Sequence, residues 1–112
     1  MIDLSYLKEI SGNDQEFIKE MLALYIQTTA AEASNLMDLL AKEDFEAIGH
    51  LAHKIKAPIQ MLGATELLEL IRSLEIYGKE KSHLDELPHI IHQVGILVDQ
   101  SVTEIKAILV NY

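Results

Sequence analysis

The 112-residue chain contains no cysteine, no tryptophan and only two prolines. The absence of cysteine excludes disulfide bonds and thiolate metal sites, and it fits a reducing compartment. No apolar run is long enough to span a bilayer, and the N-terminus lacks the pattern of a signal peptide. We therefore expect a cytoplasmic protein in which this segment does not insert into a membrane.

Basic residues are also scarce, because nine Lys and Arg stand against eighteen Asp and Glu, giving a formal net charge of −9. Nucleic-acid binding needs clustered Lys and Arg, so this charge disfavours a nucleic-acid partner. It equally disfavours an anionic membrane surface, and it fits a protein partner with a locally basic or mixed surface.

Apolar residues make up 49% of the chain and aromatic residues only 5%. Leu, Ile, Ala, Glu and Lys dominate, which is typical of an all-α protein. The length suits one domain, and we find no repeat, low-complexity segment or internal boundary. The sequence therefore predicts a single helical domain over residues 1–112.

Helical periodicity and capping signals divide the chain into a short leading helix and four longer ones. The first predicted helix ends near Ser11-Gly12, and the second runs from an Asn13–Glu16 capping box to about Lys42. The third runs from Asp44 to Gly63, and the fourth runs from a Thr65 cap to Gly78. The last helix begins with a capping box at Ser82–Asp85 and has Pro88 in its first turn. Short connections make neighbouring helices antiparallel. We expect an antiparallel up-down-up-down four-helix bundle with a short N-terminal helix.

The third predicted helix has the clearest apolar face. Its apolar residues recur at spacings of three and four: Phe45, Ile48, Ala52, Ile55, Ile59 and Leu62. At about 100° per residue, this stripe directs His53 toward solvent. Gly49 and Ala57, four residues to either side, leave the imidazole uncrowded, so another protein can approach closely. We predict Gly49, Ala57, Gln60 and Met61 as partner contacts, with core filling an equally weighted alternative for Met61.

An exposed imidazole beside an ammonium group suits phosphoryl transfer. The ring nitrogen of His53 is a nucleophile toward an activated phosphoryl group, and Lys56, one turn along, can offset the incoming negative charge. A second group must hold the other ring nitrogen and fix the tautomer. Glu75 is the candidate, because it lies twelve residues after Gly63 and His53 lies ten before it, which places both at similar heights on antiparallel helices.

Residues 52–75, AHKIKAPIQMLGATELLELIRSLE, resemble the histidine phosphotransfer (HPt) domain of two-component phosphorelays. The family pattern has Ala-His, a Lys three residues after the His, a Leu-Gly turn, and a Leu-rich helix that ends in Leu-Glu or Leu-Gln. On this resemblance, His53 is the phosphoryl acceptor, Lys56 supports the phosphoryl group and Glu75 orients the imidazole. The four-helix layout matches over essentially the whole chain.

The resemblance implies a phosphorelay intermediate that accepts a phosphoryl group on His53 from a receiver-domain aspartyl phosphate and passes it to another receiver. Such a protein is a phosphocarrier and not an enzyme with its own kinase or nucleotide site, and the sequence has no Gly-rich phosphate loop. No cofactor is expected, since Mg²⁺ would be held by the receiver. The implied partners are response-regulator receiver domains and a hybrid sensor histidine kinase, in the same or another chain, with this domain monomeric.

Two residues depart from the family pattern. Ala57 stands where the family usually has Gly, and Pro58 stands where it often has Ser. An interior proline cannot donate to the carbonyl of Lys54 and can cost ~3 kcal/mol, so we predict a bend past His53 and no break. These departures favour the alternative hypothesis, a non-catalytic helical module that binds a receiver without phosphotransfer.

A third hypothesis is a bundle that binds a metal ion or haem through its other histidines. His89 and His92 are three residues apart, but no carboxylate or third histidine is placed with them. We therefore predict that they lie on an exposed face and form no metal site. His50 is predicted to be a bystander and Lys54 a solvated charge.

Overall fold

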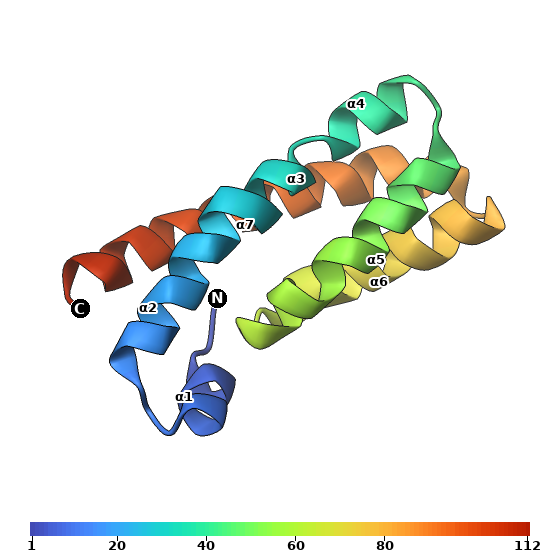
Figure 1. The fold of residues 1–112 in the computed structure, drawn as a ribbon. Helices are drawn as coiled ribbons and strands as arrows, with labels where there is room; N and C mark the ends of the chain where they lie inside the picture. Colours follow the sequence, from blue (N-terminus) through green and yellow to red (C-terminus); the bar gives the residue numbers. More distant parts are fainter.

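The computed structural model describes residues 1–112, and it consists of helices without strands. The elements are α1 (Ser5–Ser11), α2 (Gln15–Leu24), the π-helical η1 (Tyr25–Ala30), α3 (Ala31–Ala33), α4 (Leu36–Ala41), α5 (Phe45–Met61), α6 (Thr65–Glu80), the 3-10 turn η2 (Leu84–Glu86) and α7 (Leu87–Val110). In Figure 1, α5 and α6 form an antiparallel hairpin, and the run from α2 to α4 follows the long α7. The predicted all-α bundle with a short leading helix is confirmed.

One apolar core joins these helices. A single cluster of 23 buried apolar residues draws members from α1, α2, α5, α6 and α7. The predicted stripe of α5 points into it, because Ile48, Ala52, Ile55 and Ile59 are all buried. None of the helices combines the length and the apolar character that a membrane crossing needs.

The predicted second helix is not uniform. It changes from α-helix to π-helix over Tyr25–Ala30 and is interrupted again at Ser34-Asn35, between α3 and α4. Its buried residues Tyr25, Thr29 and Ala33 follow one another in steps of four, so one face stays turned to the core through the π turn. The prediction of one continuous helix from residue 13 to 42 was therefore wrong, because apolar periodicity does not distinguish an α turn from a π turn and does not reveal the break at Ser34-Asn35.

Two of the predicted helix caps were also wrong. Asp14 caps α2, because its carboxylate accepts hydrogen bonds from the backbone N–H groups of Glu16 at 3.1 Å and Phe17 at 3.2 Å. Asn13 instead has a left-handed φ of 64°. Thr65 is the first residue of α6 and not its cap, and its hydroxyl donates to the carbonyl of Gly63 at 3.3 Å.

The predicted capping box at Ser82–Asp85 is replaced by a turn. His83 takes a left-handed φ of 50°, and η2 leads directly into α7 without a side-chain cap. Pro88 lies in the first turn of α7, as predicted.

Helix α5 runs without a break through Pro58 to Met61, as expected from its apolar periodicity. Asp44 caps its start, since the carboxylate accepts a hydrogen bond from the N–H of Ala47 at 3.2 Å. The turn after α5 needs Gly63, whose φ is 66° and where a Cβ atom would lie 2.6 Å from the carbonyl oxygen of Asp3. The N-terminal segment therefore crosses this turn closely and places α1 beside the end of α5. The predicted bend at Pro58 stays a prediction.

Candidate functional site

His53 projects from the middle of α5 into solvent, with 63% of its side chain exposed. Its Nδ1 atom is hydrogen-bonded to Oε2 of Glu75, which comes from α6. The predicted register of the hairpin is thus correct. The structure also brings Lys56 to the same carboxylate, so the three residues predicted from the sequence meet in one cluster.

The Glu75 carboxylate is the centre of the cluster and only 11% of its side chain is exposed. Lys56 donates through Nζ to Oε1 at 2.8 Å, and Lys79 donates through Nζ to Oε2 at 3.3 Å. Oε2 therefore faces both His53 and Lys79, whereas Oε1 faces Lys56. A buried charge needs such partners, because an unpaired carboxylate at this depth would be strongly destabilising.

These contacts keep Glu75 ionised. The hydrogen bond from Lys56 is the largest cause that lowers the pKa of Glu75 from 4.5 to about 2. Burial acts in the opposite direction, and the bonds from His53 and Lys79 lower the pKa further. The group is thus a carboxylate at neutral pH.

The ionised carboxylate determines the tautomer of His53. A carboxylate can only accept hydrogen bonds, so Nδ1 must carry the proton that is donated to Glu75. In the neutral ring, Nε2 then holds the free lone pair. The cluster therefore presents an exposed nitrogen nucleophile whose ring is held from behind, next to two ammonium groups.

The backbones of α5 and α6 touch one turn away from this cluster. A Cβ atom on Gly78 would lie 2.7 Å from both the amide nitrogen of Gly49 and the carbonyl oxygen of Phe45. A Cβ atom on Gly49 would lie 3.1 Å from the amide nitrogen of Lys79. The two glycines therefore allow the close approach that brings Glu75 to His53.

This contact corrects two predictions. Gly49 was expected on the open surface around His53, but it is buried against α6 and cannot serve as a surface contact. Gly78 was expected to end the fourth helix, but α6 continues to Glu80, and Lys81 takes the left-handed end position. In both cases the glycine serves close packing between helices, which the pattern of one helix does not reveal.

The other predicted contact residues lie on the last turns of α5. Ala57 and Gln60 are exposed and Met61 is half-buried, and together with Tyr6 of α1 they line a surface groove. Met61 also packs against the core cluster, as the core-filling alternative predicts, and its role as a partner contact stays a prediction.

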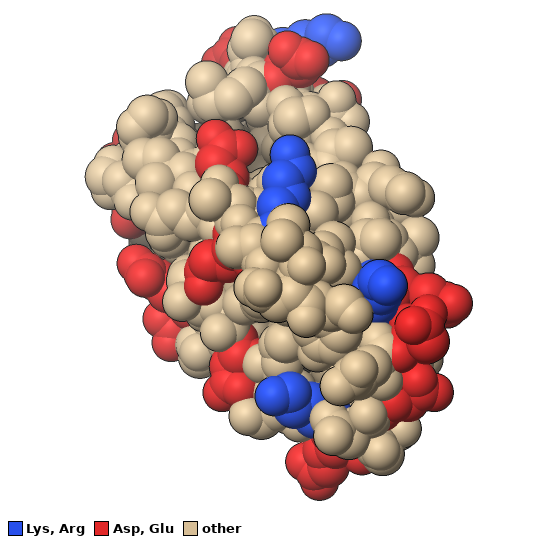
Figure 2. Space-filling model, turned by 90° about the vertical axis from the view of Figure 1, so that its left-hand side faces the viewer, with Lys and Arg blue, Asp and Glu red and all other residues tan.

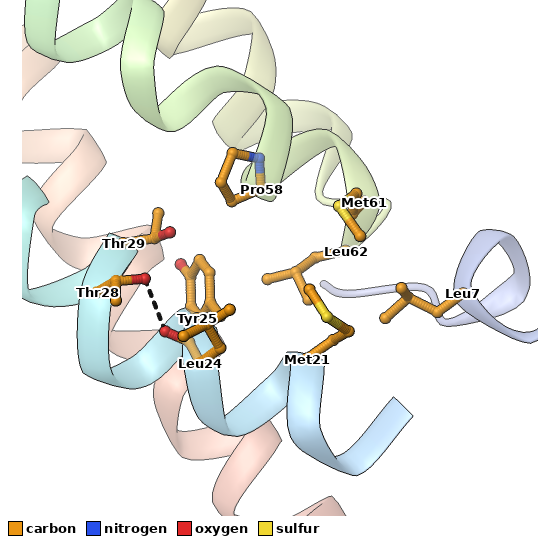
Figure 3. A pocket seen from close by; sticks show the side chains of 9 residues that line it. All are labelled: Leu7, Met21, Leu24, Tyr25, Thr28, Thr29, Pro58, Met61 and Leu62. Atoms are coloured by element: carbon orange, nitrogen blue, oxygen red, sulfur yellow. Dashed lines mark hydrogen bonds between the residues drawn. The ribbon is translucent and has the colours of Figure 1, made fainter. Parts of the chain in front are cut away.

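A second, apolar pocket lies on the other side of Met61. Figure 3 shows Met21, Leu24 and Tyr25 facing Pro58, Met61 and Leu62 across it. The remaining lining residues are Leu7, Thr28 and Thr29. The pocket thus lies between the π-helical region and the end of α5, at the position of the unusual proline.

The remaining predicted residues lie apart from the cluster. His50, His89 and His92 are exposed. No group of three or more His, Asp or Glu side chains is arranged to hold a metal ion. Lys54 is exposed, but it forms an ion pair with Glu32 of α3 at 3.1 Å and is not simply a solvated charge.

Sequence reasoning missed Lys79. The signal was present, because Glu75 and Lys79 are four residues apart on one helix, a spacing at which opposite charges meet. The Lys56–Glu75–Lys79 group carries one net positive charge in a chain of net charge −9. In Figure 2, acidic side chains gather along the left and the lower right of the face, and a few Lys or Arg side chains stand in the largely uncharged surface between them.

Residues 20–108 match the protein family described as the Hpt domain. The match runs from within α2 into the last turns of α7 and includes His53, Lys56 and Glu75. No curated protein and no solved structure matches the chain.

Proposed function

We propose that His53 is the phosphoryl acceptor of this chain, which belongs to the Hpt domain family of histidine phosphotransfer intermediates in phosphorelays. Hpt domains are phosphocarriers with no kinase catalytic domain, and they act with receiver domains in two-component systems. The observation that carries the assignment is the exposed imidazole whose Nδ1 is bound to a buried, ionised carboxylate. No other histidine of the chain has an ion pair or a hydrogen bond to its ring.

The proposed step needs only the nucleophile and its supports from this chain. The Nε2 lone pair attacks the phosphorus of a receiver's aspartyl phosphate. The N–P bond forms as the P–O bond to the aspartate breaks, and the bonding electrons leave with the aspartate carboxylate. The ring becomes a cation that keeps its Nδ1 proton on Glu75. Transfer to a second receiver reverses these bond changes and restores the neutral ring.

The role proposed for Lys56 is to support the phosphoryl group. It lies one helical turn from His53, and its Nζ atom rests on Glu75 in the unloaded site. A phosphoryl group brings about two negative charges, so it competes with Glu75 for this ammonium group. We expect Lys56 to turn toward the phosphoryl oxygens when His53 is loaded, and Lys56→Gln to slow transfer or shorten the lifetime of phosphohistidine.

The partner surface is proposed around the groove of Ala57, Gln60, Met61 and Tyr6. It lies on the last turns of α5, beyond His53, and offers small and apolar side chains that a receiver domain can approach closely. A hybrid sensor histidine kinase is a candidate source of that receiver. Mg²⁺ is assigned to the receiver, and no cofactor is assigned to this chain.

The alternative of a non-catalytic module rested on Ala57 and Pro58. Helix α5 is continuous through both residues, and the contacts that His53 and Lys56 make with Glu75 are formed although Pro58 follows Lys56 by two residues. The geometry thus gives no reason to expect loss of phosphotransfer, and the alternative becomes an outcome of the test.

The test is transfer from receiver domains charged with labelled phosphate, using the parent chain, His53→Gln and His50→Gln. His50 is a matched control, because it is an exposed histidine on the same helix. We expect acid-labile, base-stable label on the parent and on His50→Gln and none on His53→Gln. Label on His53→Gln at the parent level would overturn the assignment, and a folded parent unlabelled by several receivers would establish the non-catalytic module.

A further inference from the structure

Lys79 holds the same carboxylate oxygen as His53. Its Nζ atom lies 3.3 Å from Oε2 of Glu75, and the side chain is 51% exposed. The Gly49–Gly78 contact fixes its backbone, since the amide nitrogen of Lys79 lies against Gly49. Lys79 therefore has a defined position beside the imidazole, although it is not on the helix that carries His53.

The need for a second lysine follows from the charges of the loaded site. In the unloaded site, Lys56 and Lys79 both neutralise Glu75 and leave one net positive charge. When Lys56 turns to the phosphoryl group, Glu75 loses the shorter of its two lysine ion pairs while it stays largely buried. Lys79 then remains as the only lysine on the carboxylate, beside the cationic ring of His53.

The charge balance of the loaded site also requires Lys79. Phosphorylation adds about two negative charges on the phosphoryl group and one positive charge on the ring. With both lysines present, these charges cancel those of the cluster, and without Lys79 the loaded site carries one net negative charge. An excess negative charge near the N–P bond opposes the phosphorylated state.

We propose that Lys79 is a positioning residue that holds Glu75 on the imidazole of His53 while Lys56 is engaged with the phosphoryl group. This inference rests on the proposed function, and it assigns the two lysines different tasks. Lys56 is exchanged between Glu75 and the phosphoryl group, whereas Lys79 stays on Glu75 throughout.

The experiment measures the lifetime of phosphohistidine on the full chain by ³¹P NMR after loading with phosphoramidate, a small chemical phosphoryl donor. The variants are Lys79→Gln, Lys79→Arg and the control Lys106→Gln, which removes an exposed lysine of α7 that makes no ion pair. Signal that remains on His53→Gln is subtracted. We expect Lys79→Gln to shorten the lifetime about two- to five-fold, which corresponds to the loss of one partly exposed ion pair.

The conservative variant separates positioning from a general structural role. Lys79→Arg keeps a cation within reach of Glu75 and should restore the parent lifetime, whereas loss of packing would not be rescued in this way. A lifetime of Lys79→Gln equal to that of Lys106→Gln overturns the inference.

The two proposals fail in different ways. If receivers transfer no label to a chain that phosphoramidate loads at His53, the relay function fails, and the lifetimes still decide the role of Lys79. If neither phosphoramidate nor the charged receivers give label that depends on His53, both proposals are overturned.

Discussion

The α5–α6 hairpin and the run from α2 to α4 both cover the core, but they do so by different means. In the hairpin, two α-helices of 17 and 16 residues meet backbone to backbone at Gly49 and Gly78. In the run, the helix widens to a π turn at Tyr25–Ala30 and is interrupted at Ser34-Asn35. Its buried polar contact to α7 is made between side chains, from Tyr25 to Ser101 at 2.8 Å.

This difference shows where exact placement matters. Three donors converge on one carboxylate in the hairpin, and such an arrangement tolerates little displacement of the backbone that carries it. The run has no comparable cluster of charged side chains. We therefore expect substitutions in the hairpin to affect both stability and phosphotransfer, and those in the run to affect stability alone.

Gly78→Ala should give the largest effect. The new Cβ atom would lie 2.7 Å from two backbone atoms of α5, which cannot move aside as a flexible side chain can. We expect a loss of ~1–3 kcal/mol in the free energy of unfolding, as for other overpacked sites. Transfer should also fall, because separating the helices moves Glu75 away from His53. Urea unfolding and the receiver-transfer assay measure the two effects.

Gly95→Ala is the matched control for that substitution. Gly95 is a helical glycine of α7 with nothing within 4 Å of its Cβ position. Alanine there should stabilise the protein by up to about 1 kcal/mol through helix propensity, with transfer unchanged. Equal stabilities of Gly78→Ala and the parent would show that the glycine contact does not set the spacing of the hairpin.

Glu75→Gln should give the second largest loss of stability, and the size of this loss should depend on pH. The pKa of Glu75 is lowered from 4.5 to about 2 in the folded protein, so its ionised form stabilises the fold. This contribution is fully present above pH 4.5 and is lost as the pH falls through about 2. The parent should therefore be more stable than Glu75→Gln at neutral pH, and the difference should shrink across that interval.

Urea unfolding of the parent and Glu75→Gln at several pH values measures this difference. A difference that stays constant from neutral pH down to about 2 would show that the charge of Glu75 contributes nothing to stability. Transfer by Glu75→Gln at neutral pH should be slowed, since a neutral amide supports the cationic ring less well than a carboxylate.

Most of the fold could be predicted from the sequence, and the failures have one kind of cause. Apolar periodicity located α5, α6 and α7, because each buries one regular stripe. The π turn was missed, since apolar periodicity predicts a helix without distinguishing an α turn from a π turn. Asn13 and Asp14 are both good caps, and the left-handed conformation of Asn13 decides between them.

Tyr25→Phe tests the α2–α4 run. The variant removes the hydroxyl that meets Ser101, while Ser101 keeps its own hydrogen bond to the carbonyl of Val98 at 2.6 Å. No buried donor is left unpaired, so we expect a loss of about 1 kcal/mol in the free energy of unfolding. Transfer should match the parent. Slowed transfer with an unchanged fold would show that the π-helical region reaches the site, through the pocket that Tyr25 shares with Pro58.

The part of the candidate site that could be predicted from the sequence is the part that depends only on the register of one hairpin. A tight turn at Gly63 and two periodic helices fix the register that joins His53 to Glu75. Gly49 was wrongly predicted to lie on the surface. The periodicity of α5 gives its direction on that helix, but it does not reveal that Gly78 of α6 packs against it. The contacts of Lys56 and Lys79 with the same carboxylate likewise could not be predicted before both helices were positioned.

Glu32→Gln should have the smallest effect and probes the link between the two regions. Glu32 of α3 and Lys54 of α5 form the one ion pair between run and hairpin, at 3.1 Å, with 29% and 69% of their side chains exposed. An exposed pair of this kind contributes at most about 1 kcal/mol and is weakened by salt. We expect a small loss of stability at low salt, none at high salt, and unchanged transfer at both. Transfer slowed as much as by Lys79→Gln would mean that the run positions His53 through Lys54, and the hairpin could then no longer be treated as the self-sufficient carrier of the site.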